Sequence, residues 1–198
     1  MQAFASSMPA QVSAPAVDVR AVQAIDATFD LNAFMTGASS LFRDVRAAFN
    51  TGSLDPVAGR LSPELTAIMG KQLQYTTTTA HQQNMTSIDD LSVELLGVDA
   101  GSTGEIVAVV RFDVVGRLGQ VALNADVPAA TQLAGLPQRS WFEIWRLARP
   151  AGISTPPPVT VCSSCGAPAT GETHCRFCHA LLVDATVGFH VVGIECMG

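Results

Sequence analysis

Charged side chains are scarce in this chain, and basic ones are the scarcest. Asp, Glu, Lys and Arg make up 14% of the 198 residues, against about 25% in an average soluble protein. Eleven basic residues stand against seventeen acidic ones, the formal net charge is -6, and Lys71 is the only lysine. Nucleic-acid binding needs clustered Lys and Arg to neutralise phosphates, so this balance argues against a nucleic-acid partner.

The sequence also lacks the long apolar run of a membrane span and the basic start of a signal peptide. No apolar stretch approaches the roughly 18 residues that cross a bilayer, and no basic residue precedes Arg20. A hydrophobic share of 48% excludes a disordered chain. We therefore expect a soluble domain over residues 26–198, preceded by an Ala-, Ser- and Pro-rich leader over 1–25 that is flexible or bound by a partner.

Helical periodicity dominates the start of this domain. Apolar residues recur every three or four positions after Asp30, which predicts a helix with Asp30 as N-cap that ends near Gly52. A second helix is expected from Pro63, capped by Ser62, and the β-branched Thr run at 76–79 should fray or end it. The predicted buried faces are Phe34, Ala38, Leu41, Phe42, Val45 and Phe49 in the first helix, with Arg43, Asp44 and Arg46 turned away, and Leu65, Ile68, Met69 and Leu73 in the second.

After residue 90 the apolar period changes to two, which is typical of strands. Strands are expected at 91–95, 106–115, 121–123, 140–148 and 187–194. Residues 101–104 should form a turn, and a loop should follow through 128–137. Val110, Phe112 and Val114 share one face of the second strand, and this face is expected to pack against the first helix. The layout is α+β, with helices first and an antiparallel sheet after them.

Four of the five cysteines form two C-x2-C pairs, Cys162 with Cys165 and Cys175 with Cys178. Each pair can place two thiolates on one side of a tetrahedron, which is the arrangement of a zinc site. Four Cys ligands leave no open position for a catalytic water, so the zinc would be structural. We expect one zinc ion in a ribbon over 158–184, inserted between the last two strands. Disulfides and an iron–sulfur cluster are the alternatives.

Two residues follow the cysteine pairs directly. Gly166 suits a tight turn that aims backbone N–H groups at the sulfurs, and His179 takes the same place after the second pair, either as an alternative ligand or as a turn residue. Arg176 is the only basic residue of the ribbon, which favours a protein contact or a rigid brace over nucleic-acid binding. The remaining cysteine, Cys196, is expected to act as a small apolar side chain.

Three segments resemble a known family. Residues 30–38 resemble the first helix of the domain named after subunit 44 of the mitochondrial inner-membrane translocase. Residues 143–149 resemble its E-x-W-x-F-x-R strand, with Leu147 in place of the aromatic residue. The final strand at 187–194 resembles its closing strand, with Phe189 in the Trp position. Bacterial members often carry two C-x2-C pairs between those strands, as here. Residues 118–138 match no part of the pattern.

The resemblance implies a nuclear-transport-factor-2-like cone, in which helices pack in the concavity of a curved antiparallel sheet. Members of the family are mostly non-enzymatic; the mitochondrial one tethers the import motor and touches membrane lipid. The implied function is a non-catalytic protein-binding or tethering module in a larger or membrane-associated complex, located in the cytoplasm or at the cytoplasmic face of the inner membrane. With a net charge of -6, we expect membrane association to be indirect. A homo-oligomer is left open.

The strand expected at 140–148 presents Trp141, Glu143, Trp145 and Leu147 on one face. This face is either part of a groove for a peptide or acyl chain or ordinary core packing, and we favour packing. Glu143 and Arg149 are expected to form a structural pair on it.

The alternative function is a small-molecule-binding or enzymatic protein that uses the central cavity of the cone. His190 and Asp113 are the candidate catalytic residues for this alternative, but they lie on different predicted strands and nothing in their spacing brings them together. The non-catalytic function is therefore favoured. The adjacent carboxylates of Asp89 and Asp90 are expected in a solvated turn.

Overall fold

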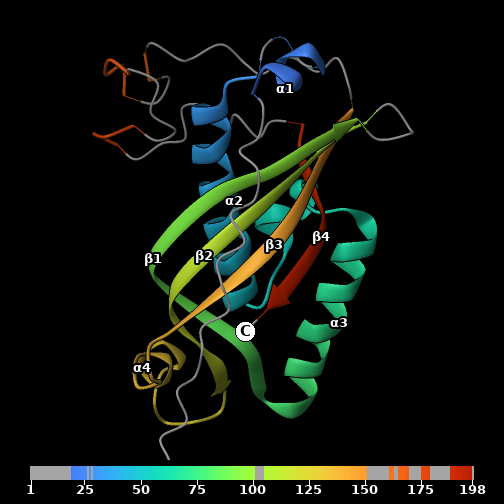
Figure 1. The fold of residues 1–198 in the computed structure, drawn as a ribbon. Helices are drawn as coiled ribbons and strands as arrows, with labels where there is room; N and C mark the ends of the chain where they lie inside the picture. Colours follow the sequence, from blue (N-terminus) through green and yellow to red (C-terminus); the bar gives the residue numbers. More distant parts are fainter. Residues whose placement is uncertain are drawn as a thin grey trace, which may run out of the picture.

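The computed structural model describes residues 19–25, 27, 29–100, 105–150, 161–162, 165–169, 175–178 and 188–197. Its elements are α1 (Val19–Ile25), α2 (Leu31–Asn50), the 3-10 helix η1 (Asp55–Arg60), α3 (Pro63–Thr79), β1 (His81–Ala100), β2 (Glu105–Ala122), α4 (Ala129–Ala134), β3 (Arg139–Pro150) and β4 (His190–Met197). The strands form one antiparallel sheet in the order β1-β2-β3-β4. Figure 1 shows the sheet curving past α2, with α3 beside β4. The predicted α+β layout is confirmed.

Helix α2 begins and ends where local chemistry dictates. The carboxylate of Asp30 accepts a hydrogen bond from the backbone N–H of Ala33 at 2.9 Å, so it satisfies one donor of the first turn. After the C-cap Thr51, Gly52 has a φ of +79°, a left-handed conformation that glycine adopts without strain. All six residues of the predicted face are buried. Both predicted ends and the buried face are confirmed.

This face of α2 packs into the concave face of the sheet. The ring of Phe42 stacks on that of Phe112 in β2, with centroids 4.6 Å apart, and lies 4.9 Å from that of Trp145 in β3. Val110 and Val114 belong to the same core cluster. The predicted contact between helix and strand is confirmed.

Helix α3 begins and ends as predicted but differs from the prediction in its buried face. The hydroxyl of Ser62 accepts from the N–H of Leu65 at 3.1 Å, and Pro63 takes the first position. The helix continues to the last residue of the Thr run, Thr79, and ends there, as one of the two predicted outcomes; three of the Thr hydroxyls donate to carbonyls four residues earlier. Ala80, with a φ of +55°, ends it. The prediction for Ile68 is wrong, since this side chain is 57% exposed.

The first three strands are longer than predicted, and the helices α1 and α4 were not predicted. β1 begins at His81, ten residues early, and β2 absorbs the strand predicted at 121–123. The short helix α4 replaces part of the predicted loop, and β4 lies three residues later than expected. Three register shifts interrupt β1. Bulges of this kind bend a strand and break its period of two, which hid the first half of β1 from pattern analysis.

Asp89 and Asp90 lie within β1 and not in a turn, which corrects the prediction. A register shift separates Ile88 from Asp90, so Asp89 occupies a bulge. Its carboxylate accepts from Arg117 at 3.0 Å and from Gln138 at 2.7 Å. The bulge thus directs the Asp89 carboxylate to two specific donors.

Several sequence predictions lie outside the described residues, among them the turn at 101–104 and the side chain of Cys196.

In the part of the chain that the structure describes, no helix is both long enough and apolar enough to cross a bilayer.

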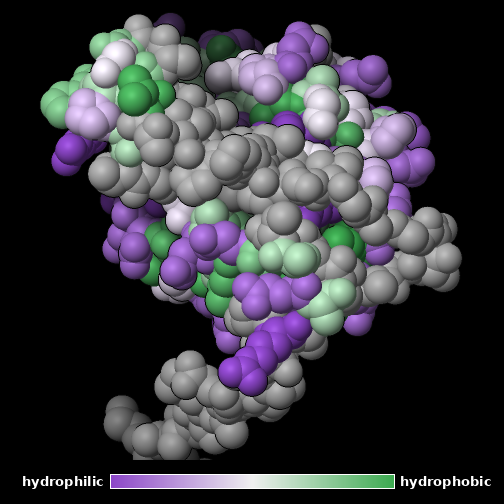
Figure 2. Space-filling model, turned by 90° about the horizontal axis from the view of Figure 1, so that it is seen from above, coloured by the Kyte–Doolittle hydropathy of each residue, from purple (hydrophilic) through white to green (hydrophobic). Residues whose placement is uncertain are grey.

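Some large apolar side chains are exposed. Figure 2 shows hydrophobic residues gathered at the left of the molecule, the side on which Figure 1 draws the cysteine segment. In that segment Val161 is 54% and Phe177 62% exposed. The guanidinium carbon of Arg176 lies 5.2 Å from the centre of the Phe177 ring. The cysteine segment therefore presents an aromatic and a cation side by side to solvent.

Candidate functional site

The first cysteine pair lies on a tight turn closed by backbone hydrogen bonds. The N–H of Gly166 donates to the carbonyl of Cys162 at 2.8 Å, and the N–H of Cys162 donates to that of Ala167 at 2.8 Å. A bridge between Val161 and Pro168 extends the turn. Gly166 has a φ of +71°, which favours glycine at this position. The turn predicted at Gly166 is confirmed.

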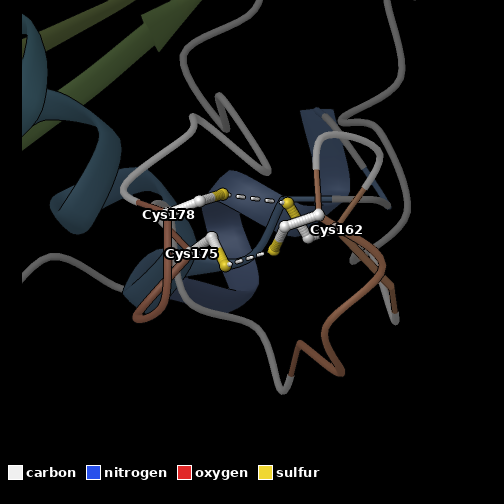
Figure 3. A group of neighbouring side chains, drawn as sticks. Cys162, Cys175 and Cys178 are labelled. Carbon is white, nitrogen blue, oxygen red and sulfur yellow. Dashed lines mark hydrogen bonds between the residues drawn. The ribbon is translucent and has the colours of Figure 1, made fainter.

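The four cysteine side chains converge on one point. All four Sγ atoms lie within 4.8 Å of one another, and Figure 3 shows those of Cys162, Cys175 and Cys178 turned inward. Two short contacts join the pairs, since the Sγ atoms of Cys162 and Cys178, and those of Cys165 and Cys175, are each 3.6 Å apart. Zinc–sulfur bonds of about 2.3 Å place tetrahedral ligands about 3.8 Å apart, whereas a disulfide needs about 2.05 Å. Two of the four cysteines are buried and two are exposed, and their geometry fits a metal ion.

Neighbouring groups shift the pKa values of two of the four thiols. The N–H groups of Cys178 and Phe177 point at the sulfur of Cys175 and lower its pKa to about 6. At Cys165 the N–H of Ala167 lowers the pKa, but contacts with the sulfurs of Cys178 and Cys175 outweigh it and raise the pKa to about 12. Of these two sulfurs, that of Cys175 is therefore the more acidic. A metal ion would bind the sulfurs as thiolates and release their protons.

The cysteines lie between β3 and β4 in the sequence, as predicted. His179, the alternative ligand, lies outside the described residues. The ribbon boundaries at 158–184 and the leader boundary at 25 stay predictions. Val22 of α1, which falls inside the predicted leader, is buried in the core cluster.

A second polar cluster lies on the concave face of the sheet, around Glu143. One carboxylate oxygen accepts from the indole N–H of Trp141 at 3.0 Å, and the other accepts from that of Trp145 at 2.9 Å. The second oxygen also accepts from the guanidinium of Arg46 on α2. The side chain of Glu143 is 2% exposed and that of Arg46 12%. A buried ion pair between Arg46 and Glu143 thus joins α2 to β3, and the indole N–H groups of both tryptophans donate hydrogen bonds to its carboxylate.

This cluster corrects two predictions and confirms one. The face that carries Trp141 and Glu143 is buried, as expected. Arg46, expected on the outer side of α2, turns inward, and it replaces Arg149 as the partner of Glu143. Six residues of a strand span about 20 Å, too far for the predicted pair. Arg149 instead lies over the ring of Phe189, 4.7 Å from its centre.

A cavity of about 290 Å³ opens next to the Arg46–Glu143 pair. Helices α2 and α3 and all four strands contribute to its lining, which is apolar except at a few positions. The lining residues include Arg46, Glu143, Phe49, Met69 and Trp141, as well as the exposed Ile68. The cavity occupies the concave side of the sheet, where the resemblance placed a central cavity.

The two candidate catalytic residues do not meet. Asp113 lies opposite Phe142 in the register of β2 and β3, and His190 lies opposite Ala148 in that of β3 and β4. These positions are six residues apart on β3, or about 20 Å. The carboxylate of Asp113 instead accepts from Arg111 at 2.7 Å. Neither candidate lines the cavity described above.

Comparison with known families gives one result. The model of the family described as Tim44-like domain matches residues 16–120, more than half of the chain. The match runs from α1 through most of β2 and ends before β3, the cysteines and β4. The similarities noted in β3 and β4 therefore lie outside it. No curated protein matches the chain in a sequence search.

Proposed function

The chain belongs to the Tim44-like domain family, and from this membership we propose that it is a non-catalytic protein-binding or tethering module in a larger or membrane-associated assembly. The family match over residues 16–120 carries the proposal, because it covers α1 to α3, β1 and most of β2, which is more than half of the chain. The net charge of -6 favours indirect attachment to a membrane over direct attraction to anionic lipid. The proposed location, which follows from the family resemblance, is the cytoplasm or the cytoplasmic face of the inner membrane.

Exposed groups on the cysteine segment support a protein contact there. Aromatic residues, including Phe, and arginine are enriched at the cores of protein interfaces. Phe177 and Arg176 are such a pair and stack in solvent. The leader is the other candidate contact, as a tether to the partner.

Co-purification from native extract tests the proposal. We expect the full chain to retain a reproducible protein partner and a chain without residues 1–18 to lose it. The deletion stops before α1, because Val22 is part of the core. Phe177→Ser should weaken retention, whereas Tyr75→Ser, which changes a side chain of similar exposure (58% against 62%) on α3, should not. A chain that purifies alone and monomeric would contradict the tether.

Zinc is the proposed metal, one ion held by Cys162, Cys165, Cys175 and Cys178. Four thiolates match the preference of zinc for soft ligands in a tetrahedron, and no position remains for a catalytic water. The ion would be structural, because a short ribbon cannot bury a core of its own.

We expect elemental analysis to find about one zinc per chain after purification without chelator. Cys175→Ser should lose the metal and increase hydrogen exchange in β4, because the ribbon joins β3 to β4. Cys196→Ser, at the one cysteine outside the cluster, should keep the zinc. Less than about half an equivalent of zinc, with disulfides in its place, would reject the site.

A further inference from the structure

Arg46 and Glu143 form the polar floor of the cavity, and the guanidinium of Arg46 has more hydrogen-bond donors than Glu143 uses. A guanidinium offers five N–H groups, and Arg46 uses one nitrogen on Glu143. Its Nε has no hydrogen-bond partner among the described residues but is buried, so a ligand in the cavity would bond to an Nη group. The carboxylate of Glu143 already accepts from Trp141, Trp145 and Arg46. The group that complements this floor is therefore an acceptor.

The charge of the floor selects the kind of acceptor. Arg46 and Glu143 neutralise each other, and the other polar side chains of the lining, Gln72 and Asn84, are uncharged. An anionic group would lose its hydration and lie beside the Glu143 carboxylate with no second cation to compensate it. A neutral carbonyl oxygen takes the free donors without that cost.

The walls and the mouth of the cavity determine the polarity and the size of the rest of the ligand. Phe49, Met69 and Trp141 supply apolar walls. Ile68 lines the same cavity yet is 57% exposed, so it stands at the mouth, where a ligand would cover it. A volume of about 290 Å³ is at the small end of ligand pockets, which span about 300–1,000 Å³.

We propose that this cavity binds a small, neutral, mostly apolar molecule whose ester or ketone carbonyl accepts a hydrogen bond from Arg46. This binding activity goes beyond the proposed tethering function and does not depend on it. Ile68, whose exposure contradicts the helical pattern of α3, gains a role as part of the binding site.

Tryptophan fluorescence of the full chain tests the proposal directly, because one of its two tryptophans lines the cavity and the other contacts the same carboxylate. The probes are methyl octanoate and sodium octanoate, which differ in charge at the same chain length. We expect a saturable change with the ester and at least about tenfold weaker binding of the octanoate anion.

Matched variants on α3 separate the cavity from the helix surface. Ile68→Glu should weaken ester binding about tenfold or more, through lost apolar contact and an added charge at the mouth. Tyr75→Glu, two turns further along and outside the lining, should bind as the parent chain does. The proposal fails if the ester gives no saturable signal up to its solubility, if octanoate binds equally well, or if both variants bind alike.

Discussion

Glu143→Ala is expected to lower the free energy of unfolding by about 3–5 kcal/mol, the usual range when one partner of a buried ion pair is removed. The substitution leaves the guanidinium of Arg46 buried, with only 12% of its side chain exposed, and without its carboxylate. It also removes the acceptor of both indole N–H groups, on Trp141 and Trp145. Urea denaturation followed by far-UV circular dichroism measures the loss.

An exposed ion pair of the same sheet provides the control. Glu195 on β4 pairs with Arg146 at 3.1 Å, and the two side chains are 52% and 56% exposed. Water screens such a pair, so Glu195→Ala should cost less than about 1 kcal/mol. Glu143→Gln should lie between the two, because its amide oxygen can still accept from an indole. Equal losses for Glu143→Ala and Glu195→Ala would show that the buried cluster does not stabilise the fold.

Features set by neighbouring residues could be predicted from the sequence. The N-caps Asp30 and Ser62 act on backbone groups within three residues, so their chemistry is readable in a short window. The buried faces of α2 and β2 follow from periodicity for the same reason. The cysteine cluster is a similar case, since the C-x2-C spacing itself places two sulfurs on one side of a metal.

Features set by tertiary geometry could not be predicted from the sequence. The pattern of β3 identified the face that carries Glu143, but it did not show which cation of another element reaches that face. Arg46 lies on the edge of the apolar stripe of α2, four residues after Phe42 and three before Phe49. A cation in that position is either solvated or turned inward, and only the packing of the helix decides which.

The prediction that Ile68 is buried was wrong for a related reason. The period of α3 marks it as apolar and correctly spaced, yet α3 stands beside β4 at the margin of the sheet (Figure 1). A helix at a margin buries a narrower stripe than a helix in the concavity. Leu65 and Met69 fill that stripe, and Ile68 lies outside it. The width of the buried stripe depends on the neighbours of a helix and not on its own sequence.

Phe42→Ala should cost about 3–5 kcal/mol, the range for truncating a fully buried aromatic residue. The side chain of Phe42 has no exposed surface, and its ring fills the space between Phe112 and Trp145, within 5 Å of both. The guanidinium of Arg46 also lies over this ring, 5.5 Å from its centre. Removing the ring therefore opens a cavity in the core and takes away the apolar support of the Arg46–Glu143 pair.

Urea unfolding of Phe42→Ala can be followed by tryptophan fluorescence, to which Trp145 beside Phe42 contributes. It should show a lower midpoint with an unchanged slope, because the surface exposed on unfolding stays nearly the same. Phe42→Leu should lose less, since most of the volume remains and mainly the aromatic contacts disappear. Phe177→Ala removes the same side chain at a position that is 62% exposed and should cost less than about 0.5 kcal/mol. If Phe42→Ala proves as mild as Phe177→Ala, then α2 does not pack in the concavity of the sheet, and the cavity beside Arg46 loses its wall.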